Sequence, residues 1–244
     1  MKAEHERQLR LLDLQALDTR LAQIAHRLAK LPAQQRVDEL SRARNAAESD
    51  LVKAKMQASD VSREVTKAEA DVQVVRDRMA RDQARLDAGV SAKEALSLQH
   101  ELESLTRRQA ALEDDQLDVM ERAEATAGLV AYVEGCLHDV ATELAEAVAV
   151  RDEARSALET EAEQVRRRRA DMTPLIGDDL LALYEKILAQ TGMGAAAVLH
   201  RRCEGCRLEL LGDDVARIKK APVDEVVRCE ECRRILVRTA ESGL

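Results

Sequence analysis

The sequence is short of the residues that usually fill a compact core. It has no Phe, no Trp and two Tyr among 244 residues, and its hydrophobic 45% is mostly Ala, Leu and Val. Only three Pro and nine Gly interrupt the chain, and eight of these twelve residues follow residue 173. Charged residues make up 34%. This composition is typical of long helices and coiled coils rather than of a globular domain with an aromatic core.

The sequence also lacks a segment that would direct it into or across a membrane. It has no apolar run long enough to span a bilayer. Its first residues, MKAEHERQLRLLD, lack the apolar stretch of a secretory signal. We therefore expect a cytoplasmic protein with no membrane partner. The net charge of −8 disfavours general coating of DNA but leaves a local basic patch open.

Apolar residues recur at alternating spacings of three and four through the first 170 residues. The series begins with Leu14, Leu17, Leu21, Ile24, Leu28 and Leu31. Such spacing is the heptad repeat of a coiled coil. The next apolar position, Val37, follows after six residues instead of seven. Because Pro32 lies in this step and lacks a backbone N–H, we expect a kink near Pro32.

The segment DAGVSAKE, residues 87–94, divides the repeat into two arms of about equal length. Gly89 can end one helix, and Ser91 with Glu94 can form a capping box for the next. This pattern predicts an antiparallel helical hairpin with its turn near residues 87–92. The alternative is a parallel dimer of one continuous helix, in which a capped turn at the midpoint would be out of place.

The pattern changes after residue 170. Pro174 and Gly177 interrupt it, and DDLLALYEKILAQ predicts a short amphipathic helix. Short β-rich segments follow (RLEL, DEVVR and ILVR), with a helical turn, GDDVARIKK, among them. The expected fold is therefore mainly α. A coiled-coil hairpin spans residues 1–170, a linker with a short helix spans 171–194, and a small β-rich domain spans 195–244.

Four of the five cysteines form two C-x2-C pairs in this last segment. They are Cys203, Cys206, Cys229 and Cys232. Two thiolates from each of two tight turns supply the four sulfurs that Zn²⁺ accepts in structural sites. A redox C-x-x-C would stand as one pair in a βαβ context, iron–sulfur clusters use other spacings, and disulfides need an oxidising compartment. We therefore predict a zinc ribbon with one structural Zn²⁺.

Two further inferences come from the cysteines. Four protein thiolates leave the metal no open position for water, so the zinc is expected to be structural rather than catalytic. The fifth cysteine, Cys136, adjoins the heptad residue Leu137, and we interpret it as a small, half-buried apolar residue.

Three segments resemble a known bacterial family. They are VSAKEALSLQHELESLTRR at 90–108, CEGC at 203–206 and CEECRRILV at 229–237. The chain is similar to bacterial proteins that join a long N-terminal coiled-coil hairpin to a four-cysteine zinc ribbon. The resemblance implies an adaptor without known catalytic activity. Such adaptors bind proteins and, in some members, nucleic acid, with links to gene regulation and to flagellar or secretion assemblies.

Two positions depart from that family's pattern. Ala92 and Ala95 stand where Asn and Tyr usually flank the Lys-Glu pair of the turn, which separates this chain from functions specific to that turn. Arg233 stands where Gly usually follows the last cysteine. It predicts either a slightly different second turn around the metal or an exposed basic contact.

Two groups of basic residues are candidate binding sites for nucleic acid or a protein partner. They are Arg166, Arg167, Arg168 and Arg169 near the end of the hairpin, and Arg201, Arg202, Arg207, Lys219, Lys220, Arg233 and Arg234 in the last segment. Together they could form one phosphate-binding patch where hairpin and ribbon join. However, ten basic residues face nine acidic ones from residue 195 on, and no aromatic residue is present there for base stacking. A mixed, solvated surface is the alternative.

The sequence contains no recognisable catalytic set. Its five His are scattered, and no Ser/His/Asp set, phosphate loop or HExxH motif is apparent. We expect no enzymatic activity and no small-molecule substrate. The leading hypothesis is a zinc-binding adaptor in gene regulation that contacts a protein partner and can also bind nucleic acid. The alternative is primarily an RNA- or DNA-binding regulator that acts through the basic patch at the ribbon–hairpin junction.

Overall fold

A computed structural model describes residues 1–244. The chain divides into two compact units. The hairpin unit is Gln35–Ala149, and the ribbon unit combines Met1–Gln34 with Val150–Leu244. No helix is both long and apolar enough to cross a membrane.

Three long helices account for most of the chain: α1 (His5–Ala29), α2 (Pro32–Asp87) and α3 (Ala92–Met172). Pro32 is the first residue of α2, where its missing N–H removes no helical hydrogen bond. Gly89 follows α2 with a φ of 86°, a left-handed conformation that glycine adopts without strain. Glu94 N donates to Ser91 Oγ over 3.4 Å at the start of α3. These residues make the turn between α2 and α3.

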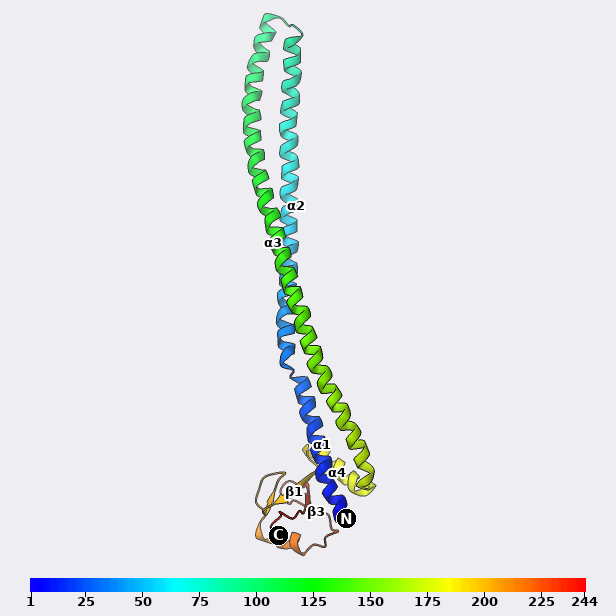
Figure 1. Ribbon diagram of the computed structural model, residues 1–244. Helices are drawn as coiled ribbons and strands as arrows, with labels where there is room; N and C mark the ends of the chain where they lie inside the picture. The colour runs from blue at the N-terminus through cyan, green and yellow to red at the C-terminus, as the bar shows by residue number, and fades with distance from the viewer. The chain divides into compact units, whose positions relative to one another are not determined.

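Within the hairpin unit, α2 and α3 run antiparallel (Figure 1). Apolar residues line the seam between the two helices. The buried apolar seam residues of α2 are Val37, Leu40, Ala54, Val61, Val72 and Val75. Ion pairs flank the seam, and Arg36–Glu143 and Lys55–Glu134 show its antiparallel direction. Such exposed pairs contribute little stability individually. The predicted mainly α fold with a long antiparallel hairpin is confirmed.

Asp82 is the exception in this seam. It is buried among the apolar seam positions, and its Oδ2 accepts no hydrogen bond. Its nearest cation is the guanidinium of Arg78, one helical turn earlier, at 3.8 Å. Burying a carboxylate whose Oδ2 has no hydrogen bond is unfavourable, so Asp82 weakens the contact between the two helices at this level.

In the ribbon unit, α1 packs against the last turns of α3 and against the helices that follow it. The chain continues from α3 through a 3₁₀ turn, Thr173–Leu175, into α4 (Asp178–Thr191). A core forms around the fully buried Tyr184, with Leu11 and Leu14 from α1 and with Ile235 and Val237 from the sheet. The first helix therefore shares its core with the ribbon.

The sheet has four short strands: β1 (Ala195–Leu199), β2 (Arg202–Cys203), β3 (Val227–Arg228) and β4 (Ile235–Val237). Their order is β2-β1-β4-β3, and β1 pairs with β4 in parallel while the other pairs are antiparallel. Helix α5 (Gly212–Lys220) lies between β2 and β3 in sequence. The segment RLEL forms no strand, and its Glu209 makes only an isolated bridge to Arg202.

The first residues of the chain pair with the ribbon. Ala3 N donates to Asp224 O over 2.7 Å, and Val226 N donates to Met1 O over 3.1 Å. The Lys2 ammonium also pairs with the Asp224 carboxylate at 3.0 Å. These contacts join positions more than two hundred residues apart in sequence, so no local pattern predicts them.

Candidate metal centre and its surroundings

Each cysteine pair lies in a tight turn next to a strand. Arg207 N donates to Cys203 O over 2.7 Å, and Arg233 N donates to Cys229 O over 3.0 Å. Both arginines follow the second cysteine of their pair, and both have a φ of 62°. The two turns therefore share one left-handed backbone position. A φ of 62° lies in the region that glycine adopts without strain, which fits the glycine that the family resemblance implies at the place of Arg233.

The four sulfurs lie together. Cys203 Sγ is 3.8 Å from Cys232 Sγ, and Cys206 Sγ is 3.9 Å from Cys229 Sγ. All four ligand atoms lie within 4.8 Å of one another. A tetrahedral Zn²⁺ with Zn–S bonds of about 2.3 Å needs sulfurs roughly 3.8 Å apart. The cluster is thus able to bind one structural zinc ion.

The environment of the sulfurs fits a metal site. Burial raises the pKa of Cys203 and of Cys229. Backbone N–H groups of Gly205 and Cys206 act in the opposite direction on the pKa of Cys203. Burial would also raise the pKa of Cys232, but the N–H of Arg234 and the neighbouring thiols lower it overall. A divalent cation supplies the positive charge that four crowded thiolates need, and its binding would release protons.

Two arginines near the cysteines hold the ribbon together. Arg234 donates to Gly205 O over 2.7 Å and to Thr191 O over 3.2 Å, so it links the two cysteine turns to the end of α4. Arg238 donates to five backbone carbonyls. Those carbonyls belong to Ile218, Ala221, Pro222, Val223 and Glu225. Both guanidinium groups therefore stabilise the fold by donating hydrogen bonds to backbone carbonyls that would otherwise lack a partner.

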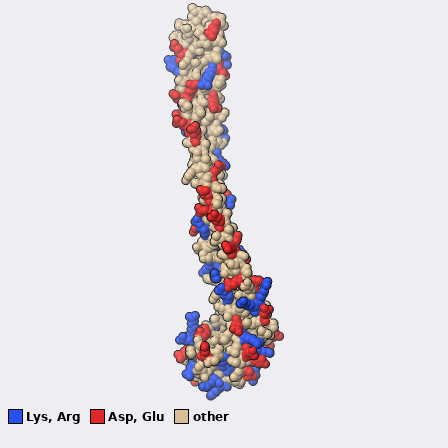
Figure 2. Space-filling model, in the orientation of Figure 1, with Lys and Arg blue, Asp and Glu red and all other residues tan.

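Several of the basic residues singled out in the sequence already have partners. Arg166 and Arg167 both pair with Glu163, one turn earlier on α3. Arg169 pairs with Asp18 at 2.7 Å and with Glu185 at 3.2 Å. Arg201 donates to Gly243 O, and Arg233 pairs with Glu230. Figure 2 shows the resulting mixture of acidic and basic side chains over the ribbon unit.

The remaining basic residues of the two groups are exposed and make no side-chain ion pair or hydrogen bond. They are Arg168, Arg202, Arg207, Lys219 and Lys220. Arg202 and Arg207 flank the first cysteine pair, whereas the two lysines end α5. The structure thus separates a set of free cations from the cations that stabilise the protein.

A buried polar network joins α1, α3, α4 and β1. Gln15 Oε1 accepts hydrogen bonds from Gly194 N over 2.7 Å and from Ala195 N over 3.3 Å. The Tyr184 hydroxyl donates to Asp18 Oδ2 over 2.8 Å, and Arg169 holds that carboxylate. Burial and the Asp18 carboxylate raise the pKa of Tyr184, so its hydroxyl stays neutral. Sequence reasoning missed Gln15 because a single Gln in a helical repeat carries no signal.

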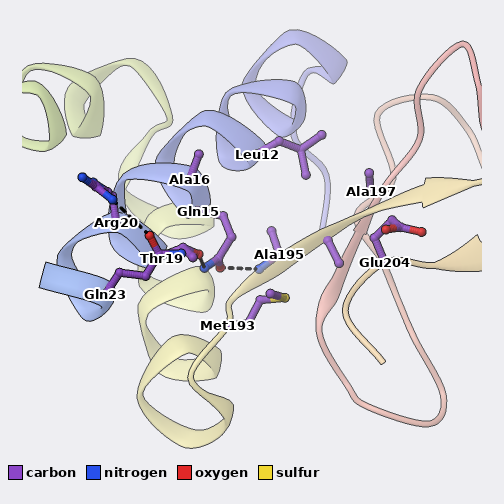
Figure 3. A pocket seen from close by; sticks show the side chains of 11 residues that line it. Leu12, Gln15, Ala16, Thr19, Arg20, Gln23, Met193, Ala195, Ala197 and Glu204 are labelled. Carbon is purple, nitrogen blue, oxygen red and sulfur yellow. Dashed lines mark hydrogen bonds between the residues drawn. The ribbon is translucent and has the colours of Figure 1, made fainter. Parts of the chain in front are cut away.

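A groove of about 400 Å³ lies between α1 and β1, beside the first cysteine turn (Figure 3). Its floor is small and apolar, formed by Ala195, Ala196 and Ala197 with Met193. Arg20 on its rim is engaged by Glu161 and Gln23. Glu204, between the first two cysteines, is also among the lining residues, and its carboxylate has no partner. The groove can therefore accept an apolar group that has a cation nearby.

Comparisons with known proteins agree with this architecture. Residues 14–192 match the CT398-like coiled coil hairpin domain, and residues 202–236 match a C4-type zinc ribbon domain. An uncharacterized protein of Mycobacterium tuberculosis is 37% identical over 239 residues, covering 98% of each chain. The predicted family resemblance and structural zinc site are confirmed. Neither domain description names a catalytic activity.

Solved structures support the same conclusion. A protein from Mycobacterium smegmatis superimposes with a TM-score of 0.87 at 40% identity, covering 98% of this chain and all of that one. CT398 from Chlamydia trachomatis superimposes with a TM-score of 0.67 at 17% identity, covering 96% of this chain and 98% of its own, and supports the fold alone. The chain belongs to the CT398-like coiled-coil hairpin family and carries a C4-type zinc ribbon.

Proposed function

We propose that this chain is a non-enzymatic adaptor whose zinc centre holds a protein-docking surface in shape. In this proposal Cys203, Cys206, Cys229 and Cys232 are the zinc ligands. Because all four are thiolates, the metal has no open position for a substrate or water. The hairpin of residues 1–170, the linker of 171–194 and the ribbon of 195–244 remain our proposed functional segments.

The observation that carries the proposal is the groove beside the first cysteine turn. Its alanine floor leaves room for a bulky apolar side chain between α1 and β1. Glu204 supplies a free carboxylate between two proposed zinc ligands, directly after Cys203 and two positions before Cys206. Fully desolvated apolar anchors next to a complementary charge are typical centres of protein interfaces. The fitting partner is a protein segment with an apolar anchor and an adjacent Lys or Arg.

Photocrosslinking in native cells tests this groove. A benzophenone side chain at the exposed Ala16, which lines the groove, should crosslink a defined protein. Glu204→Arg should reduce that product roughly tenfold, corresponding to about 1.4 kcal/mol of lost affinity. The matched control is the same side chain at Ala22, which is also exposed on α1 but does not line the groove. Equal products from both positions, or none from Ala16, would rule out the groove as the docking site.

Nucleic-acid binding is the second candidate, and the free cations favour it. Among the eleven basic residues singled out in the sequence, Arg168, Arg202, Arg207, Lys219 and Lys220 have no acidic partner. Cations without partners can neutralise phosphates without first breaking a contact within the protein. The remaining six, Arg166, Arg167, Arg169, Arg201, Arg233 and Arg234, would have to give up or share existing contacts.

A salt titration separates this candidate from protein docking. Anisotropy of labelled single-stranded RNA and duplex DNA should show that Lys219→Ala/Lys220→Ala lowers the slope of log K against log salt by about one to two. The matched control is Arg166→Ala/Arg167→Ala, which removes two cations already paired with Glu163 and should change the slope little. Absence of binding by the native chain at low salt would remove nucleic acid as a partner.

A further inference from the structure

Helix α3 carries a second stripe with coiled-coil spacing in addition to its seam with α2. The stripe contains Arg122, Ala125, Leu129, Tyr132, Cys136 and Asp139, separated by three, four, three, four and three residues. Leu129 is 43% exposed and Tyr132 is 70% exposed. Residues at this spacing lie along one side of a helix, as the a and d positions of a coiled coil do. This apolar side of α3 has no partner within the chain.

Two glycines beside the stripe have no role in packing within the chain. Gly128 and Gly135 lie inside α3, and a Cβ on either would meet nothing within 4 Å. Glycine inside a helix costs about 1 kcal/mol relative to alanine. Because the chain itself needs no space at these positions, the glycines fit the close approach of another helix.

Two copies of the stripe complement each other when their helices run antiparallel. Two copies of α3 aligned antiparallel, with the two-fold axis between residues 130 and 131, place Arg122 opposite Asp139. The same alignment places Ala125 opposite Cys136 and Leu129 opposite Tyr132. Each pair occurs twice across a two-fold axis. A parallel alignment would instead oppose Arg122 to Arg122 and Asp139 to Asp139.

The charges at the two ends of the stripe are available for this contact. Asp139 is exposed and has no ion pair or hydrogen bond within the chain. Arg122 is also exposed and holds Glu64 through one nitrogen at 2.8 Å, which leaves its other donors free. The next positions in the spacing, Asp118 and Glu143, are both acidic and would face each other. The contact therefore ends at Arg122 and Asp139.

We propose that a second copy of this chain docks antiparallel on the Arg122–Asp139 stripe of α3. The stripe spans about 26 Å of helix at 1.5 Å per residue. Such a contact falls at the low end of interface size, below about 1,200 Å² in total. The dimer is accordingly weak and reversible, and it forms at high local concentration.

Sedimentation of the zinc-loaded full chain over a concentration series measures this dimer. Tyr132→Glu should raise the dissociation constant at least about tenfold by placing a charge in the apolar centre. Asp139→Arg should weaken the dimer through Arg–Arg repulsion, and adding Arg122→Asp should restore it. Val52→Glu, at an exposed apolar position of α2, is the matched control and should leave the dimer unchanged. Circular dichroism confirms that each variant keeps its helix content.

Crosslinking tests the register. In zinc-loaded protein, Ala125→Cys should join Cys136 of a second copy through a short bismaleimide, whereas Ala131→Cys should not. A chain that stays monomeric at all concentrations would overturn the proposal. A dimer that tolerates both Tyr132→Glu and Asp139→Arg would overturn it as well. Loss of the dimer in Tyr132→Glu without charge rescue or the 125–136 crosslink would overturn the proposed antiparallel docking.

Discussion

Cys229→Ser should abolish zinc binding and unfold the ribbon sheet while the hairpin unit stays helical. Cys229 is 1% exposed, and its sulfur lies 3.9 Å from that of Cys206. Serine offers a hydroxyl that is a much poorer zinc ligand than thiolate. The variant would also leave three thiols crowded around a buried hydroxyl. Both effects act against the folded ribbon.

The expected effect is large because metal binding and ribbon folding are coupled. Structural zinc contributes about 10–16 kcal/mol in small zinc domains, which is comparable to the whole stability of a typical domain. The core around the cysteines is a small cluster of aliphatic side chains, including Ala196, Val198 and Leu236, and contains no aromatic residue. Apolar burial there cannot replace the metal. A strong zinc chelator should therefore reproduce the effect of the substitution on the native chain.

Zinc content and hydrogen exchange provide the measurements. Cys229→Ser should lose its zinc, and amides of β1 to β4 should lose protection while those of residues 35–149 keep it. Because α1 and α4 share a core with the sheet, their amides should also exchange faster. Cys136→Ser is the matched control, since Cys136 lies outside the sulfur cluster, and it should keep full zinc content. Full metal occupancy in Cys229→Ser would refute the proposed ligand set.

Gln15→Ala should destabilise the ribbon unit by about 3 kcal/mol. Gln15 is 6% exposed, and its carbonyl oxygen accepts hydrogen bonds from Gly194 N and Ala195 N. Alanine would leave both buried N–H groups without an acceptor, and each such loss costs about 1–3 kcal/mol. The same change removes the contact that holds the start of β1 against α1. The α1–β1 groove should open in consequence.

Urea unfolding, followed by a probe in the ribbon unit, checks this value. Gln15→Glu keeps an acceptor oxygen in place and should cost less than Gln15→Ala. Gln23→Ala is the matched control because Gln23 is exposed on the same helix, and it should change stability by less than about 0.5 kcal/mol. If Gln15→Ala unfolds at the same urea concentration as Gln23→Ala, the network does not stabilise the unit.

Local patterns predicted the parts of this protein that depend on neighbours in sequence. The heptad spacing predicted the α2–α3 hairpin because each turn of a coiled coil repeats the same contact. The two C-x2-C pairs predicted the sulfur cluster because the geometry of each turn is set within four residues. The capping residues Ser91 and Glu94 marked the start of α3 within one residue.

Contacts between distant segments escaped prediction. Strand β1 is rich in alanine, which has low strand preference, and pairing with β4 makes it a strand. Lys2 and Ala3 join the ribbon through backbone pairing with a segment more than two hundred residues later. Arg234 looks like a surface cation in the sequence, yet it binds the carbonyls of Gly205 and Thr191. Composition cannot distinguish such an arginine from the free Arg202.

X-ray absorption at the zinc edge of the purified full chain measures the ligands of the metal and so tests whether the zinc site is closed. We expect one zinc per chain with four sulfur scatterers at about 2.3 Å and no oxygen or nitrogen in the coordination shell. Such a closed shell marks a metal that holds the ribbon in shape and binds no substrate. A shell of three sulfurs with one oxygen at about 2.0 Å would refute a purely structural zinc, because it would leave the metal an open, reactive position.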